Sequence, residues 1–268
     1  MIEALKEHQA PLVRDVKLQH AILSALKNLC VDPEGRPLLV KAGILQPCLD
    51  LAAGLSLTPI TQPVVMKLLA TFRLLVDTEK EVLLAFSEER PDILSQIVTY
   101  SNHEGPGPRA ESGRLLASII KKSQNKKAMK NIIELGGLPA ITVMLHSSHP
   151  IMVNESLMAL TILTTSFASS PDPQDPALIH QHLHTDLIIN GVKKIINHED
   201  FPSELRANAA TFMIALLKIE PDVFKQMLVD LNFYTECFPE DKLPTMWKEL
   251  KDLAKMLEKW QFQRLNNS

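Results

Sequence analysis

An amphipathic segment that recurs about every 45 residues is the feature that most restricts what this chain can fold into. Its copies are VKLQHAILSALKNLCVD (Val16 to Asp32), PVVMKLLATFRLLVD (Pro63 to Asp77), RAESGRLLASIIKK (Arg109 to Lys122), NESLMALTILTT (Asn154 to Thr165) and RANAATFMIALLK (Arg206 to Lys218). Apolar residues recur in each copy at the three- and four-residue spacing of a helix. The sequence therefore predicts an all-α protein built from repeats.

A second recurring element lies between these segments. It appears as RPLLVKAGILQPCLDLA (Arg36 to Ala52) and as KKAMKNIIELGGLPAITVML (Lys126 to Leu145), each with an internal glycine, Gly43 and Gly136. A short helix, a glycine corner, a second helix and a longer third helix in about 42 to 45 residues form the armadillo pattern. We predict an armadillo-repeat right-handed α-solenoid of about five repeats over residues 1–220.

The ends of the predicted array have a different composition. SFASSPDPQDPA, residues 166–177, has the composition of a loop insert between two repeats. Residues 221–268 are expected to form a divergent repeat and a C-terminal capping helix, Pro244 to Phe262, with charge on much of its circumference. Because no comparable polar cap precedes the first third helix, we expect the chain to be a fragment or isoform of a longer solenoid.

Composition excludes several classes of protein. Lys and Arg number 28 against 31 Asp and Glu, a net charge of −3 with a pI near 6.3, which disfavours a nucleic-acid partner. The three cysteines, Cys30, Cys48 and Cys237, form no C-x-x-C pair, which predicts a reducing compartment, taken as the cytosol, and argues against a disulfide framework or a zinc site. No apolar run of about 20 residues is apparent, so we expect no stable membrane insertion.

Four segments in a fixed order resemble the closing armadillo repeats of the small-GTPase GDP-dissociation stimulator family. They are QHAILSALKNLC (Gln19 to Cys30), VMKLLATFRLLVD (Val65 to Asp77), ESGRLLASIIKKS (Glu111 to Ser123) and HPIMVNESLMAL (His149 to Leu160). The similarity runs from about Lys17 to Leu163. It implies an armadillo scaffold that binds Rho, Rac or Rap-type GTPases with polybasic, prenylatable tails. In that family the scaffold acts as an exchange factor on some GTPases and as a chaperone for others.

The resemblance also implies which residues contact a partner, since third helices line the family's concave groove. Carried over one residue at a time, the predicted groove residues are His20, Ser24, Asn28, Lys67, Thr71, Arg73, Glu111, Arg114, Asn154 and Glu155. His20, Ser24 and Asn28 follow each other at four-residue spacing, which places them near one helix face. Gly113 stands where the family has a polar residue, which is expected to loosen the helix and remove a contact.

Each of these features also has a purely structural interpretation. Asn28 can brace a neighbouring repeat instead of a partner, and Glu111 can simply pair with Arg114 on the helix surface. The five lysines of KKSQNKKAMK, Lys121 to Lys130, are typical of a solvated edge between two helices, although they would also attract an acidic partner or lipid.

Signals for covalent chemistry are weak. His180, His182, His184 and Asp186 suggest a metal site because His180 and His184 are four residues apart, but a bare pair of this kind specifies a site poorly. The sequence has no phosphate-binding loop of the G-x-x-x-x-G-K type and no G-x-S-x-G elbow. We therefore predict no enzyme activity, no catalytic residue, no metal and no cofactor.

Two functions remain as hypotheses. The first is a guanine-nucleotide exchange factor that binds small GTPases in the groove and stimulates GDP release; the acidic balance of the chain suits a basic partner tail. The second is a non-catalytic adaptor or chaperone for small GTPases or other proteins. An enzyme based on the histidine cluster is a distant third.

Overall fold

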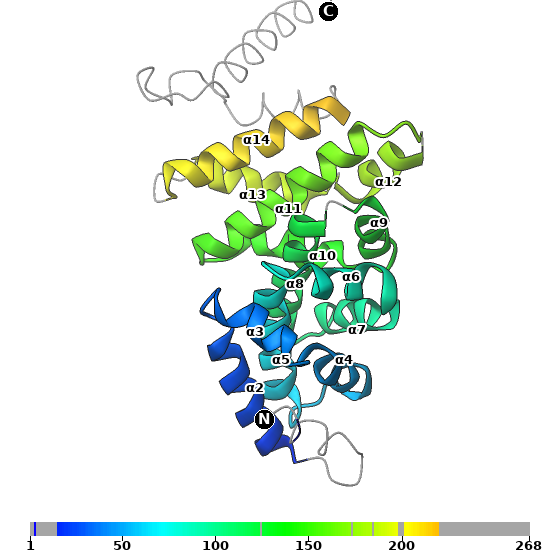
Figure 1. Cartoon of the computed structure of the whole chain (residues 1–268). Helices are drawn as coiled ribbons and strands as arrows, with labels where there is room; N and C mark the ends of the chain where they lie inside the picture. Colours follow the sequence, from blue (N-terminus) through cyan, green and yellow to red (C-terminus); the bar gives the residue numbers. More distant parts are fainter. Residues whose placement is uncertain are drawn as a thin grey trace, which may run out of the picture. The chain divides into compact units, whose positions relative to one another are not determined.

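The computed structural model describes residues 3, 15–123, 125–172, 174–183, 185–197 and 201–219. Every regular element in these ranges is helical (Figure 1). The chain divides into two compact units, Met1–Ser147 (unit 1) and Ser148–Ser268 (unit 2). The predicted repeat and capping helix at 221–268 lie outside the described residues.

Unit 1 repeats a short helix, a second helix and a long third helix. Its elements are α2 (Val16–Leu29), α3 (Gly35–Lys41), α4 (Leu45–Gly54), α5 (Gln62–Val76), α6 (Lys80–Leu84), the π-helical turn η1 (Ala85–Glu89), α7 (Pro91–Ser101), α8 (Pro106–Ser123), α9 (Lys126–Glu134), α10 (Leu138–Val143) and the 3-10 turn η2 (Met144–His146). The long helix α5 packs against α2 on one side and α8 on the other. Successive third helices are therefore neighbours.

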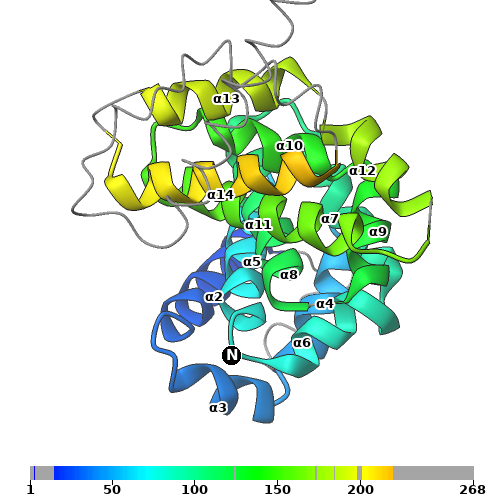
Figure 2. The same cartoon turned by 90° about the horizontal axis from the view of Figure 1, so that it is seen from above.

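Unit 2 continues the same order of elements. It contains α11 (Pro150–Ala168), α12 (Gln174–Leu183), α13 (Asp186–Asn197) and α14 (Ser203–Ile219). Its two long helices, α11 and α14, lie side by side, while α12 packs on α11 and α13 packs on α14 (Figure 2).

The predicted third helices agree with α2, α5, α8, α11 and α14 to within a few residues at each end. The described elements therefore follow the predicted order of a short helix, a second helix and a long third helix. Proline at the start of α5, α7, α10 and α11 fits because the first helical turn has no use for the missing N–H. Asp15 and Asn125 begin α2 and α9 by accepting backbone N–H groups of the first turn.

The predicted loop insert at 166–177 is helical at both ends. Helix α11 continues to Ala168 and α12 already begins at Gln174. The short connection is tied to α12 because Asp172 accepts the Gln174 N–H at 2.9 Å and the Ser170 hydroxyl donates to Asp175 at 2.6 Å. The Ser170 and Asp172 side chains therefore brace the start of α12, and the stretch is not one long loop.

The corner glycines behave as the repeat pattern predicts. Gly43 separates α3 from α4 with φ of 80°, and Gly136 separates α9 from α10 with φ of 83°. At the second corner the Gly136 and Gly137 N–H groups each donate 2.9 Å hydrogen bonds to carbonyls of α9, and the chain turns by 90°. A left-handed backbone is available to glycine at little cost, so the first two helices of a repeat cross steeply.

The core of unit 1 joins the repeats through buried aromatic and aliphatic side chains. Phe72 of α5 meets Phe86 of η1 edge to face at 5.1 Å between ring centroids, and the buried Tyr100 hydroxyl donates to the Leu55 carbonyl. The buried Arg36 donates to the Cys30 carbonyl at 2.7 Å and pairs with Asp77 at 3.4 Å. Arg36 thus links the C-terminal ends of two third helices, α2 and α5.

Helix α11 corrects the expectation that no segment is long enough to cross a membrane. By length and apolar composition it qualifies, with 44% of the tested window buried in the protein. Its hydroxyls at Thr161, Thr164 and Thr165 bond to carbonyls one turn earlier, and its apolar residues pack inside unit 2. These contacts are those of the core helix of a helical array.

Candidate functional site

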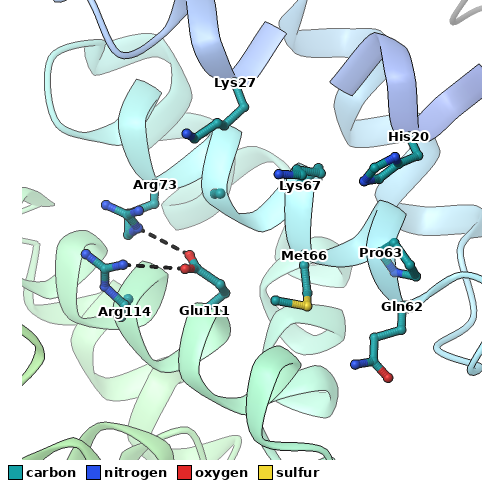
Figure 3. Close-up of a pocket in the computed structure, with 10 residues that line it drawn as sticks. His20, Lys27, Gln62, Pro63, Met66, Lys67, Arg73, Glu111 and Arg114 are labelled. Carbon is teal, nitrogen blue, oxygen red and sulfur yellow. Dashed lines mark hydrogen bonds and ion pairs between the residues drawn. The ribbon is translucent and has the colours of Figure 1, made fainter. Parts of the chain in front are cut away.

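A pocket of about 470 Å³ opens in unit 1 where the three consecutive third helices α2, α5 and α8 meet (Figure 3). Its lining residues are His20 and Lys27 from α2, Gln62, Pro63, Met66, Lys67, Ala70 and Arg73 from α5, and Glu111 and Arg114 from α8. We call this the three-helix pocket.

Helical spacing brings these side chains together. His20 and Lys27 are seven residues apart on α2, and Met66, Ala70 and Arg73 follow the four- and three-residue spacing of one face of α5. Other faces of α2 carry Ile22, Leu23 and Leu26, which are buried in the core. The amphipathic pattern that folds the helices therefore also delivers a polar row to the pocket.

Two arginines from different helices share the Glu111 carboxylate. Arg73 Nε lies 3.4 Å from Glu111 Oε2, and Arg114 Nη1 lies 3.4 Å from Glu111 Oε1. The three side chains are 17 to 20% exposed, so the cluster is partly shielded from water but not closed. Figure 3 shows the two guanidinium groups on the same side of the carboxylate, each joined to it by a dashed line.

The pocket has more positive than negative side chains. Lys27, Lys67, Arg73 and Arg114 face one carboxylate, Glu111. Neither Lys27 nor Lys67 forms an ion pair with any residue that the structure describes, and the Lys27 amine has only Asn28 Oδ1 at 3.5 Å. In the view of Figure 3 both lysines lie above Glu111.

Apolar side chains complete the pocket beside these charges. Pro63, Met66 and Ala70 of α5 contribute the apolar part of the lining. Helix α8 approaches closely here, because a Cβ on Gly107 would lie 2.9 Å from the Met66 sulfur. The pocket therefore offers a ligand both charge and apolar contact.

Five predicted groove residues meet in this pocket: His20, Lys67, Arg73, Glu111 and Arg114. Lys27 was missed because the prediction followed four-residue steps from His20 to Asn28. Each such step advances the helix face by about 40°, so two steps drift by about 80°, whereas seven residues return to within about 20°. The His20 to Lys27 spacing was the signal that would have found it.

Three other predicted residues in unit 1 do not line the pocket. Thr71 is buried, and its hydroxyl donates to the Lys67 carbonyl at 2.8 Å. Asn28 is exposed beside Lys27, and the buried Ser24 hydroxyl has no hydrogen-bond partner among the described residues. The prediction for these positions used helix periodicity alone, which does not separate the edge of a face from its centre.

Gly113 has a packing role. It is buried in α8, where an added Cβ would lie 2.9 Å from the Ala140 carbonyl oxygen and 3.1 Å from the Met144 sulfur. The absence of a side chain thus allows α8 and α10 to approach closely. The sequence predicts a looser helix and a lost polar contact at Gly113, and the structure adds that this position packs against α10.

In unit 2 the predicted residue Asn154 pairs with a residue that sequence reasoning missed. Asn208 Nδ2 of α14 donates to Asn154 Oδ1 of α11 at 2.7 Å, and both side chains are half-buried. Glu155, the next residue on α11, is also half-buried. Asn154 and Asn208 both lie within the first two turns of their helices.

Among the residues that the structure describes, the remaining candidates from the sequence do not come together in a site. His180 and His182 lie on α12 and Asp186 begins α13, but His184 falls outside the described residues. Over the described ranges, no group of three or more His, Cys, Asp or Glu side chains could hold a metal ion. In the lysine run at Lys121 to Lys130, Lys122 pairs with Asp77 at 2.9 Å.

No family model matches the chain, but curated relatives do. Rap1 GTPase-GDP dissociation stimulator 1-B of Xenopus laevis is 27% identical over 209 residues, which are 77% of this chain and 32% of the relative. The 1-A protein of the same organism is 32% identical over 151 residues, 56% of this chain and 24% of that protein. GTPase-GDP dissociation stimulator vimar of Drosophila melanogaster is 29% identical over 198 residues, 62% and 30% of the two chains. The predicted resemblance is confirmed, and this chain spans about a third or less of each of these relatives.

Solved structures agree on the fold. A designed armadillo repeat protein in complex with the peptide (KR)4 superposes with a TM-score of 0.59 at 14% identity, covering 85% of this chain and 87% of its own. A second designed armadillo repeat protein reaches 0.62 at 15% identity, covering 96% of this chain and 100% of its own. At these identities the likeness is one of architecture.

Proposed function

We propose that this chain is a regulator of small GTPases that binds them through its third helices and stimulates GDP release. The observation that carries the proposal is the convergence of five predicted groove residues in one pocket, in a chain whose relatives are named GTPase-GDP dissociation stimulators. The pocket combines charge with apolar contact, which suits recognition of a protein surface.

Exchange of this kind needs no covalent residue. A protein that binds the nucleotide-free GTPase more tightly than the GDP-bound form lowers GDP affinity by that difference in binding free energy. The charged cluster of Arg73, Glu111 and Arg114 is suited to such a role because it can exchange internal ion pairs for contacts with the partner. In this proposal the chain is neither an enzyme nor a cofactor protein.

The resemblance favours partners of the Rho, Rac or Rap type with polybasic tails, in the cytosol. The three-helix pocket does not supply the preference for a basic tail, since four cationic side chains in its lining would repel one. A basic tail would have to bind elsewhere on the chain.

A non-catalytic adaptor or chaperone for small GTPases is the second candidate. The observation that favours it is coverage, because the chain spans 24 to 32% of its curated relatives. A groove of that extent can hold a partner without favouring the nucleotide-free state.

Release of fluorescent GDP separates the two candidates. A panel of Rho, Rac and Rap-type GTPases is loaded with labelled GDP, and release is followed with and without a substoichiometric amount of this chain. Acceleration of any member supports an exchange factor, whereas binding in a parallel pull-down without acceleration supports the adaptor. If no GTPase of the panel showed either acceleration or binding, both candidate functions would be contradicted.

The variant Arg73→Glu tests whether the pocket carries this binding. It places a second carboxylate beside Glu111 and is expected to lower GTPase affinity about tenfold, as for one lost charge-assisted contact. Lys80→Glu is the matched control, since Lys80 is exposed on α6 and outside the pocket lining. Equal affinity of the two variants would remove the pocket from the proposal.

A further inference from the structure

We propose that the three-helix pocket binds an acidic segment of the partner protein, with Lys27 and Lys67 receiving its carboxylates. This names the chemistry of the partner at the site of the proposed function, and it rests on that proposal only for the identity of the partner.

Positive side chains are concentrated in the three-helix pocket. Four cationic side chains and one carboxylate line the pocket, whereas the whole chain has a net charge of −3. A local excess of positive charge in a hollow surrounded by protein raises the concentration of anionic groups there. The excess is therefore a property of this site and not of the chain as a whole.

Lys27 and Lys67 of the pocket are not neutralised by an acidic side chain of the described residues. Arg73 and Arg114 share Glu111, but Lys27 and Lys67 have no acidic partner in the described parts of the chain. Both are only half-exposed, so part of their hydration is already lost without a compensating ion pair. A carboxylate from a partner would supply that pair.

Apolar side chains line the pocket beside its charged groups. Pro63, Met66 and Ala70 lie beside the charges, and the volume of about 470 Å³ is within the usual range for bound ligands. A free ion would use only the charges, whereas a peptide segment would also cover the apolar surface. The combination favours a protein segment rich in Asp or Glu.

Glu111 shows which group the site accepts. Its carboxylate pairs with both guanidinium groups, with Arg73 through Oε2 and with Arg114 through Oε1. Because both arginines are already paired, an incoming carboxylate would pair with Lys27 and Lys67, which have no acidic partner among the described residues. The pocket therefore has one part in which Arg73 and Arg114 are paired with Glu111, and another part in which Lys27 and Lys67 can bind a partner's carboxylates.

The test uses fluorescein-labelled decapeptides in which four Glu, four Gln or four Lys residues alternate with Gly and Ser. Binding to the full chain is measured by fluorescence anisotropy at 50 mM and 300 mM NaCl. We expect the Glu peptide to bind at least about fivefold more tightly than the Gln peptide at low salt, to lose most of that preference at high salt, and the Lys peptide to bind most weakly.

A matched pair of double variants locates the site. Lys27→Gln/Lys67→Gln is expected to abolish the preference for the Glu peptide. Lys80→Gln/Lys127→Gln makes the same charge change at two exposed lysines outside the pocket and is expected to keep it. Circular dichroism verifies that both remain folded. No preference for the Glu peptide, or an equal loss in both variants, would overturn the inference.

Two further arms separate other anions and the proposed function. If an oligonucleotide or an anionic lipid vesicle bound more tightly than the Glu peptide and depended on Lys27 and Lys67, the assignment to an acidic protein segment would be wrong. If a GTPase responded in the GDP-release assay but ignored the pocket variant, the inference would fail while the proposed function stood. Retained peptide selectivity with no responding GTPase would contradict the proposed function alone.

Discussion

The two units place different chemistry between neighbouring third helices. In unit 1, α5 and α8 are joined by Arg73 and Glu111 at 3.4 Å, and Arg114 pairs with the other oxygen of the same carboxylate. In unit 2, α11 and α14 are joined by the amides of Asn154 and Asn208 at 2.7 Å. One unit therefore joins neighbouring third helices by a charged cluster and the other by a neutral hydrogen bond.

The backbone packing of the third helices differs as well. Helix α8 contains Gly107 and Gly113, and both lie where an added Cβ would crowd a neighbouring helix. Helices α11 and α14 contain no glycine. The comparison shows that both units share the armadillo order of helices. A few polar or glycine positions then give each unit its own surface and its own helix spacing.

The largest expected effect comes from breaking the core of unit 1 alone. Leu26 is fully buried in α2, so Leu26→Asp would bury an unpaired charge and cost about 4 kcal/mol or more of unfolding free energy. We expect hydrogen exchange to rise steeply in α2 and α5 and least in α11 and α14, because repeats transmit stability mainly to their neighbours.

The control for this variant is Leu29→Asp on the same helix. Leu29 is 48% exposed, so its replacement is expected to change the melting temperature little. Similar melting of the two variants would mean that the assigned facing of α2 is wrong. Uniform loss of protection across all third helices would mean that the two units unfold together.

Gly113→Ala tests the close packing of α8. Helix propensity would favour alanine by about 1 kcal/mol, but the new Cβ would meet a backbone carbonyl that cannot rotate away, at a cost of about 1 to 3 kcal/mol. We expect a net loss of about 1 kcal/mol in denaturant unfolding. A gain in stability would show that α8 and α10 separate easily.

Double-mutant cycles compare the two joining pairs directly. For Arg73→Gln with Glu111→Gln we expect a coupling of about 0.5 kcal/mol at low salt that falls toward zero in 1 M NaCl, because the pair is partly exposed. For Asn154→Ala with Asn208→Ala we expect about 1 kcal/mol, independent of salt. Equal salt dependence would erase the distinction between the units.

The smallest expected effect concerns acid. Burial raises the pKa of Asp77, but the hydrogen bond and charge of Lys122, with Lys121 and Arg36, outweigh it and hold the pKa below its usual value. A lowered folded-state pKa stabilises the protein above about pH 4 and ceases to do so as the pH falls through the folded value. The melting temperature of Asp77→Asn should therefore be lower than that of the parent at pH 6, and the difference should shrink as the pH falls through the folded-state pKa. A constant difference would exclude titration of Asp77.

Most of the fold was predictable from the sequence because it depends on periodic signals. Apolar spacing located all five described third helices, and glycine located both left-handed corners. The loop insert at 166–177 was placed by composition, which does not reveal that Asp172 and Ser170 cap a helix. Capping depends on single hydrogen bonds, and these have no periodic trace.

The site was predictable only in part. Resemblance identified Arg73, Glu111 and Arg114, but it did not show that they form one cluster or that Lys27 joins the same pocket. Asn208 was missed because its partner Asn154 is 54 residues away in the chain. Contacts between repeats depend on the register of two helices, and sequence periodicity alone does not set that register.

The left-handed backbone of the two corner glycines restricts the chirality of any residue that replaces them. At Gly43 and Gly136 a side chain would meet nothing within 4 Å, so space does not require glycine there; the positive φ does. The requirement is therefore one of chirality. A D-alanine introduced by chemical synthesis would favour the positive φ that an L-residue resists.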